Sequence, residues 1–228
     1  MTSCLVSGVL LLQAVNSVIK RIKHSTQFGF ANKIGHMKMS KGRLEAFSDG
    51  VIAIIITIMV LELKAPHEAN WEAIRPLIPI LLSYVLSFVN VGIYWVNHHH
   101  LFQVVKQVDG RVLWANMHLL FWLSLIPFGT IWMGETNFTT WAVAAYGFVL
   151  LMCAIAYTIL TIALLAVHDK ESVLATAIGQ DTKGKISLGI YVIAVPLAFV
   201  NSWISCALYV LVAIIWFVPD RRIEDKLT

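Results

Sequence analysis

Long runs of apolar residues, separated by short polar stretches, are the dominant pattern of this chain. Six runs could each cross a hydrocarbon core of about 30 Å, and they lie at 45–63, 77–97, 112–133, 141–166, 186–200 and 203–219. The last two are short. A single helix over 186–219 would be about 50 Å long, so a hairpin that turns at Asn201 and Ser202 is more economical. Pro127 and Pro196 predict kinks in the third and fifth runs.

The composition identifies these runs as membrane spans. Hydrophobic residues make up 58% of the chain, charged residues only 13%, and the mean hydropathy is +0.76, whereas charged residues approach a quarter of a soluble domain. Lipid cannot satisfy free backbone groups, so spans are helices or strands of a closed barrel, and barrel strands alternate in polarity. We therefore predict an all-α integral membrane protein with six transmembrane helices.

The positions of the basic residues predict the topology. With six spans both termini share a side, and the loops on that side hold far more Lys and Arg than the opposite loops, which contain Lys64 and Arg75. The basic loop and terminal residues of the richer side are Lys20, Arg21, Lys23, Lys33, Lys38, Lys41, Arg43, Lys106, Arg111, Lys170, Lys183, Lys185, Arg221, Arg222 and Lys226. Basic residues concentrate in cytoplasmic loops. We expect a multi-pass protein of the cell (plasma) membrane with both termini in the cytoplasm, in which the net charge of +4 is a topology signal and does not indicate a nucleic-acid partner.

The first forty residues do not fit the pattern of the rest. Residues 4–15 form an apolar run that is too short to span, and the basic stretch follows it, whereas a signal peptide carries its charge ahead of the run. We expect residues 1–38 to be a poorly structured N-terminal extension, with an amphipathic anchor on the membrane surface as the alternative. Residues 39–228 then form one six-helix domain.

The first span carries an unusual acidic residue. Asp49 lies inside the apolar run, and an ionisable group at membrane depth is by default a functional candidate. The alternative is a helix N-cap, in which Ser48 and Asp49 accept hydrogen bonds from free backbone N–H groups. Beyond Asp49, helical spacing predicts one stripe along the helix, which consists of Gly50, Ile54, Thr57 with Ile58, and Leu61. By spacing alone this stripe fits lipid-facing or packing surface.

Three segments together resemble a known family. They are the first helix, with Arg43, Phe47-Ser48-Asp49, Ile54, Thr57 and Leu61; the string YWVNHHHLF from Tyr94 to Phe102; and the third run, with Trp114, Asn116 and SLIPF from Ser124 to Phe128. In these features the chain resembles the transmembrane protein 175 family of potassium channels. The similarity covers roughly residues 41–225.

The resemblance implies a function and an assembly. Bacterial members of that family form homotetramers in which the first helices line the pore, and they lack the Thr-Val-Gly-Tyr-Gly filter, which is also missing from this sequence. Carried over by position, Ile54 is the main constriction, Leu61 a second apolar ring, and Thr57 or Ile58 the layer between them. The expected function is a potassium-preferring cation channel in the lipid bilayer, with monovalent cations as the permeant species and no cofactor.

The polar residues of the first helix receive a supporting role in this interpretation. Ser48 and Asp49 would fix the cytoplasmic end of the pore helix, because a buried carboxylate needs hydrogen-bond partners. Arg43 and Phe47 belong to the same motif. The expected partners on the second and third spans are Asn97, His98, His99, Trp114, Asn116 and His118.

Two other kinds of function fit the sequence less well. A six-span secondary transporter of cations or metals, which is the alternative function, would need paired Asp or His ligands at mid-membrane depth, and Asp49 alone does not supply them. A membrane-embedded hydrolase would need a Ser, Cys or Glu/His site that faces a water-filled cavity, and neither G-x-S-x-G nor H-E-x-x-H occurs in the sequence. The consecutive residues His98, His99 and His100 point about 100° apart on a helix and cannot easily share one metal ion. We therefore expect no catalytic residue and no metal site.

Overall fold

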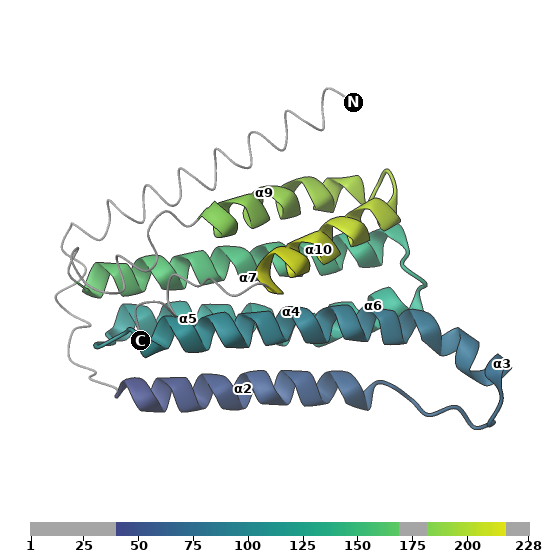
Figure 1. The fold of residues 1–228 in the computed structure, drawn as a ribbon, viewed down its shortest axis with the longest axis horizontal. Helices are drawn as coiled ribbons and strands as arrows, with labels where there is room; N and C mark the ends of the chain where they lie inside the picture. The colour runs from purple at the N-terminus through teal and green to yellow at the C-terminus, as the bar shows by residue number, and fades with distance from the viewer. Residues whose placement is uncertain (1–39, 169–181, 218–228) are drawn as a thin grey trace.

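The computed structural model describes residues 40–168 and 182–217, and within these ranges it contains helices and no strands. The predicted extension over residues 1–38 lies outside the described residues. The elements are α2 (Lys41–Leu61), α3 (Trp71–Ile74), η2 (Arg75–Leu77), α4 (Ile78–Gln103), α5 (Gly110–Ser124), α6 (Ile126–Glu135), α7 (Thr140–Val167), α9 (Thr182–Leu197) and α10 (Ser202–Phe217). The helices run side by side along one axis (Figure 1). The prediction of an all-α bundle is confirmed.

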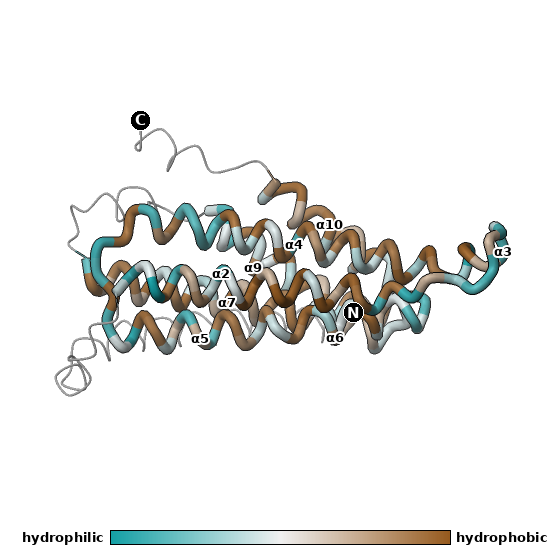
Figure 2. Tube along the Cα trace, turned by 90° about the horizontal axis from the view of Figure 1, so that it is seen from below, coloured by the Kyte–Doolittle hydropathy of each residue, from teal (hydrophilic) through white to brown (hydrophobic). Residues whose placement is uncertain are grey.

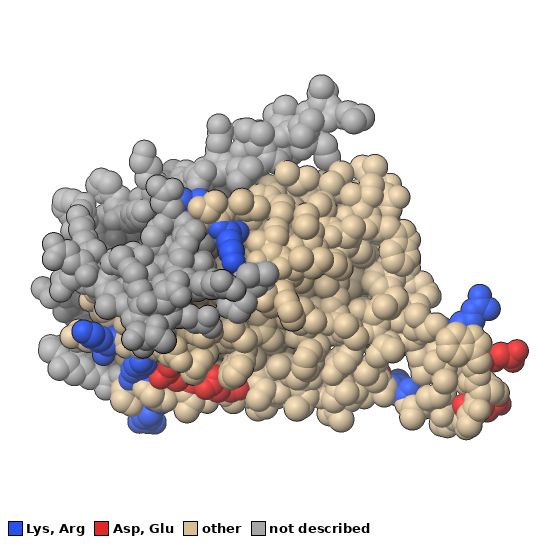
Figure 3. Space-filling model, in the orientation of Figure 1, with Lys and Arg blue, Asp and Glu red and all other residues tan. Residues whose placement is uncertain are grey.

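Four of the helical segments are long enough to cross a membrane, and the last two helices are shorter. Four continuous helical segments are long and apolar enough to span one, namely Lys41–Leu61, Trp71–Gln103, Gly110–Glu135 and Thr140–Val167. The last two helices, α9 and α10, have 16 residues each, or about 24 Å at 1.5 Å per residue. Hydrophobic residues run along the helices and hydrophilic ones gather at the ends of the bundle (Figure 2). Charged side chains also gather near the two ends in the view of Figure 3.

The two predicted interruptions are present. The third span is broken at Leu125, which separates α5 from α6, and its backbone N–H bonds to the carbonyl of Trp122 at 3.2 Å instead of one residue further back. Pro127 follows two residues later and has no N–H to continue the ladder, which explains a break at this place. The fifth span ends at Leu197, one residue after Pro196, and α10 begins at Ser202. The predicted hairpin is confirmed.

The first helix lies at one edge of the bundle. It packs against α4, α5 and α6, while α9 lies at the opposite edge (Figure 1). Its buried residues are Leu44, Ser48, Ile52, Ile55 and Met59, which share one face because they follow at three or four residues. Among the described helices, none packs against the other face of α2.

Small and polar residues bring the other helices together. At Gly134 of α6, an added Cβ would lie 2.7 Å from the Cα of Ile80 on α4, so only glycine permits this approach. Deeper in the bundle, the hydroxyls of Ser87 on α4 and Tyr146 on α7 lie 3.0 Å apart, and Thr130 on α6 lies 2.6 Å from Ser87. These buried hydroxyls satisfy one another where lipid and apolar side chains cannot.

Candidate functional site

The stripe that the sequence singled out lies on the free face of α2. Ile54 is 58% exposed, Ile58 43% and Leu61 77% in the single subunit, and Gly50 and Thr57 are exposed as well. Tertiary packing explains this placement, because the face with Ile52, Ile55 and Met59 is the one turned toward α4, α5 and α6. All the residues proposed for a pore thus share one unpartnered surface.

Thr57 adds little polarity to that surface. Its hydroxyl donates to the backbone carbonyl of Ile54 at 2.9 Å, so its proton is used within the helix and only the oxygen lone pairs are offered outward. The surface is otherwise made of isoleucine and leucine side chains. Such a surface can contact acyl chains, or, where several copies surround an axis, it can narrow and dewet a passage for ions.

A buried hydrogen-bonded chain holds the N-terminal half of α2 to its neighbours. Asn116 of α5 donates through Nδ2 to the hydroxyl of Ser48 at 2.9 Å, and its Oδ1 lies 2.9 Å from Nε2 of His98 on α4. Ser48 in turn donates to the carbonyl of Leu44 at 2.9 Å. The three side chains are at most 1% exposed. Because Ser48 has used its only proton, it must accept from Asn116, and Nε2 of His98 must then carry a proton for Oδ1.

Asp49 has a different partner from those expected. The indole N–H of Trp95 on α4 donates to Oδ1 of Asp49 at 3.0 Å, and the Trp95 ring stacks on that of His99 with centroids 5.8 Å apart. Asp49 is only half-buried in the single subunit, whereas the sequence predicted a buried carboxylate. The alternative of an N-cap is wrong, since α2 begins at Lys41, eight residues before Asp49.

The remaining predicted network residues do not bond to Ser48 or Asp49. Asn97 donates to the carbonyl of Ile93 on its own helix, His99 lies 2.9 Å from the amide of Gln103, and His118 accepts from the indole of Trp122. Trp114, Arg43 and Phe47 are exposed, Trp114 by 73%. The structure therefore assigns the network to Ser48, Asn116 and His98 and leaves these residues outside it.

Sequence reasoning missed the role of Trp95. Tryptophan is common near the ends of membrane spans, so the residue type alone gave no sign of this contact. A signal was present in its position, because Trp95 precedes His98 by three residues and His99 by four, so all three lie on neighbouring faces of one helix turn. An indole N–H at this depth needs an acceptor, and Asp49 supplies one.

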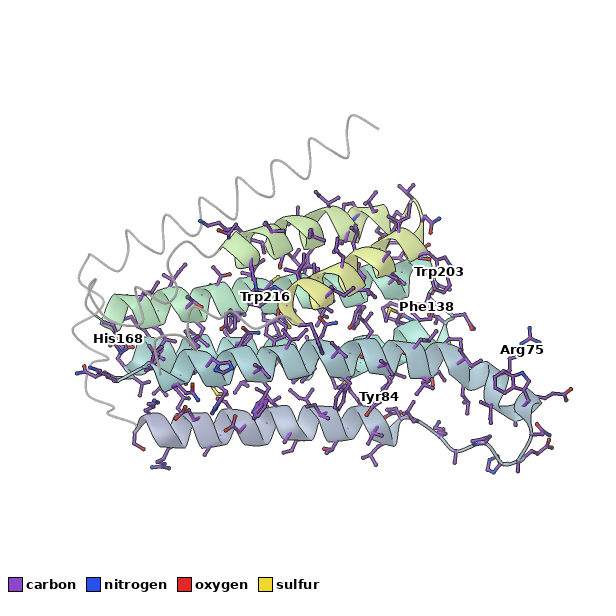
Figure 4. All side chains as sticks on the ribbon, in the orientation of Figure 1. Arg75, Tyr84, Phe138, His168, Trp203 and Trp216 are labelled. Atoms are coloured by element: carbon purple, nitrogen blue, oxygen red, sulfur yellow. The ribbon has the colours of Figure 1, made fainter. Side chains whose placement is uncertain are left out.

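The two ends of the bundle differ in charge. The basic end, as we call it, is where α2 begins, α4 meets α5, and α9 begins, and its described basic residues are Lys41, Arg43, Lys106, Arg111, Lys183 and Lys185. Lys41 donates to the backbone carbonyl of Gln103 at 3.3 Å, which joins the start of α2 to the end of α4. The opposite end carries Glu62, Glu68, Glu72 and Glu135 together with Lys64 and Arg75. Arg75 is visible there in Figure 4.

Comparison with known proteins decides the family. The family model described as "Endosomal/lysosomal potassium channel TMEM175" matches residues 43–127. A potassium channel of Chryseobacterium sp. (strain P1-3) is 53% identical over 189 residues, which is 83% of this chain and 98% of that protein. The chain belongs to the TMEM175 family. TMEM175 proteins are ion channels and not enzymes.

Two further relatives show how far the likeness to TMEM175 proteins extends. A potassium channel of Streptomyces collinus is 33% identical over 184 residues, or 76% of this chain and 89% of that protein. The crystal structure of a lysosomal potassium-selective channel TMEM175 homolog from Chamaesiphon minutus superposes with a TM-score of 0.67 at 28% identity, and the match covers 79% of this chain and 97% of the other. The segment matched by the family model runs from Arg43 to Pro127 and so contains the whole exposed stripe and the Ser48–Asn116–His98 chain.

Proposed function

We propose that the chain is one subunit of a potassium-preferring cation channel, in which the exposed stripe of α2 lines the pore. The observation that carries the proposal is the position of this stripe. It consists of the residues that the motif singled out, and it is the face of α2 that no other helix of the subunit covers. Relatives that match along most of the chain are described as potassium channels.

Four copies around one axis would bring four such stripes together. Ile54 then forms the main constriction and Leu61 a second apolar ring, with Thr57 and Ile58 between them. An apolar ring excludes ions because the passage is too narrow and too poorly wetted to keep their hydration shells. In this homotetramer the permeant species is potassium or another monovalent cation, and no cofactor takes part.

The Ser48–Asn116–His98 chain is the anchor of the pore helix in this proposal. It joins α2 to α4 and α5 at the end of the helix that lies nearest the basic end. Since the described helices contact α2 on one face only, this anchor resists rotation that would turn the stripe away from the axis. Trp95, bonded to Asp49, adds a second contact at the same level.

The charge difference between the two ends supports one orientation. Lys and Arg gather at the basic end, and such residues concentrate on the cytoplasmic side. The proposed protein is thus a multi-pass protein of the cell membrane, with the basic end and both termini in the cytoplasm. The acidic residues Glu62, Glu68, Glu72 and Glu135 then lie at the outer mouth, where they attract cations.

Cysteine accessibility tests the proposal with a matched control. Ile54→Cys is compared with Ile193→Cys on α9, because the two isoleucines are similarly exposed in the single subunit, 58% and 52%. Both variants carry Cys4→Ser, and the native Cys153 and Cys206 are buried. A thiol reacts as the thiolate, which requires water. A charged methanethiosulfonate should therefore abolish the potassium current of the Ile54→Cys channel in planar bilayers and leave the Ile193→Cys channel unchanged.

Two results would contradict the proposal. If Ile54→Cys resists the reagent while the wild-type channel conducts, α2 faces lipid. If the purified protein carries no potassium current down its gradient, or needs a coupling ion, a channel is the wrong class of function.

A further inference from the structure

A cavity lies on the side of the bundle away from α2. It is lined by residues of α4, α7, α9 and α10 and is open along part of its wall. Asn97 near the end of α4 and Trp216 near the end of α10 place one end of the cavity toward the basic end (Figure 4). From there it reaches inward to Asn90 and Tyr191.

Two hydroxyls of the cavity wall have no hydrogen-bond partner within the described residues. Within the described residues, neither Tyr94 nor Tyr191 makes a hydrogen bond through its phenol, although both line the cavity and Tyr191 is only 3% exposed. Two other hydroxyls of the wall are already engaged. Ser187 accepts from the indole of Trp216 at 2.8 Å, and Thr158 donates to a carbonyl of its own helix. Neither phenol oxygen is sealed off from the cavity, so a molecule that fills the cavity can bond to both hydroxyls.

The remaining wall determines the chemistry of that ligand. Apolar side chains of Ile93, Ala154, Val212 and Ala213 and the rings of the aromatic residues make up most of it. None of the lining residues is an acid, a lysine, an arginine or a histidine. A charged group would be desolvated there without a counter-charge, which is costly. An uncharged group that hydrogen-bonds at one end and is apolar along its length matches the wall.

We propose that this cavity binds an uncharged amphiphile of the lipid-alcohol class, whose hydroxyl bonds to Tyr94 and Tyr191 and whose alkyl chain lies against α7 and α10. A hydroxyl both donates and accepts hydrogen bonds, so the alcohol can donate to one phenol oxygen and accept from the other phenol. The site is separate from the proposed pore, because α2 contributes no residue to it. The proposal does not depend on the protein being a channel.

Photolabelling of the full chain in phosphatidylcholine nanodiscs tests this site. The probe is octanol that carries a diazirine, and its adducts are located by mass spectrometry. Labelling should fall on the cavity-lining parts of α7 and α10 and should be displaced by unlabelled 1-octanol but not by octanoate. Tyr191→Phe and Tyr94→Phe remove one hydroxyl each without changing the shape, and each should weaken labelling about two- to tenfold, the value of one net hydrogen bond.

Two further variants complete the design. Ala213→Leu fills the cavity and should remove the labelling, whereas Tyr84→Phe removes a phenol of α4 that is outside the cavity and should not change it. Thermal melting of each variant shows whether it folds, and if Ala213→Leu does not, the two Tyr→Phe variants still decide. The proposal is overturned if the Tyr94 and Tyr191 variants label like the Tyr84 control, or if octanoate competes as well as octanol. Labelling that occurs only on lipid-facing surface overturns it as well.

Discussion

Removal of the Asn116 side chain should destabilise the protein more than any other single truncation at the α2 anchor. Asn116 is fully buried and bonds to both Ser48 and His98. Each net hydrogen bond is worth about 1 kcal/mol, and a buried donor left without a partner costs about 1–3 kcal/mol. In Asn116→Ala, the Nε2–H of His98 loses its acceptor, and water cannot replace it because His98 is only 1% exposed. We expect a loss of about 3 kcal/mol in the free energy of unfolding.

A double-mutant cycle measures whether the three residues act as one unit. Ser48→Ala, Asn116→Ala and the double variant are unfolded by denaturant in mixed micelles, at one protein concentration because assembly contributes to stability. Once Asn116 is gone, Ser48 has lost the donor that it accepts from. The loss in free energy of unfolding for the double variant should therefore be smaller than the sum of the two single losses, by about 0.5–3 kcal/mol.

A matched control and a refuting outcome accompany the cycle. Ser124 also donates to a carbonyl of its own helix, at 2.7 Å, but it is exposed, so Ser124→Ala should change stability by less than about 0.5 kcal/mol. If the Ser48 and Asn116 effects add within about 0.5 kcal/mol, the two residues are independent. The argument that they anchor α2 jointly would then be refuted.

Three other substitutions test separate contacts. Gly134→Ala places a Cβ 2.7 Å from the Cα of Ile80, so α4 and α6 must separate, and unfolding should become easier by about 1–3 kcal/mol; an unchanged melting temperature would disprove the close approach. Asp109 is the N-cap of α5, and its carboxylate accepts hydrogen bonds from the backbone N–H groups of Arg111 and Val112, both at 3.0 Å. Asp109→Ala should lower the free energy of unfolding by about 1 kcal/mol in the same assay, and an unchanged value would count against the cap. Trp95→Phe removes the bond to the half-buried Asp49 and should cost no more than about 1 kcal/mol; a larger loss would show that the carboxylate is buried in the assembled protein.

The elements of the fold could be predicted because their causes are local. Apolar runs of sufficient length form helices in lipid whatever their neighbours are, since the backbone must satisfy itself. The break next to Pro127 and the turn before Ser202 follow from missing donors and from length in the same way. The start of α2 was misjudged, because the helix begins four residues before the predicted span, whose first residue is Glu45, and includes Lys41 and Arg43. Hydropathy reports where lipid begins and not where the helix does.

The partners within the site could be predicted only in part. Ser48, His98 and Asn116 were expected in one network, and the structure joins them. Asn97, His99, Trp114 and His118 were also expected in it, because they are polar or aromatic residues of the second and third spans that could reach the first helix. Trp114 is exposed, and the other three bond within their own helices. The choice among neighbouring polar residues depends on how each helix is rotated about its axis, which no local pattern specifies.

The sequence by itself determined that the chain is a bundle of membrane helices, where those helices are interrupted, and which residues of α2 lie on a common stripe. Only the tertiary structure decided that this stripe is the uncovered face of α2, that Asp49 meets Trp95, and that a cavity with free phenols lies behind α4. The physical reason is that α2 has isoleucine or leucine on nearly every side. Hydrophobicity then favours no single face, and the fit of Ile52, Ile55 and Met59 against α4, α5 and α6 fixes the rotation of the helix.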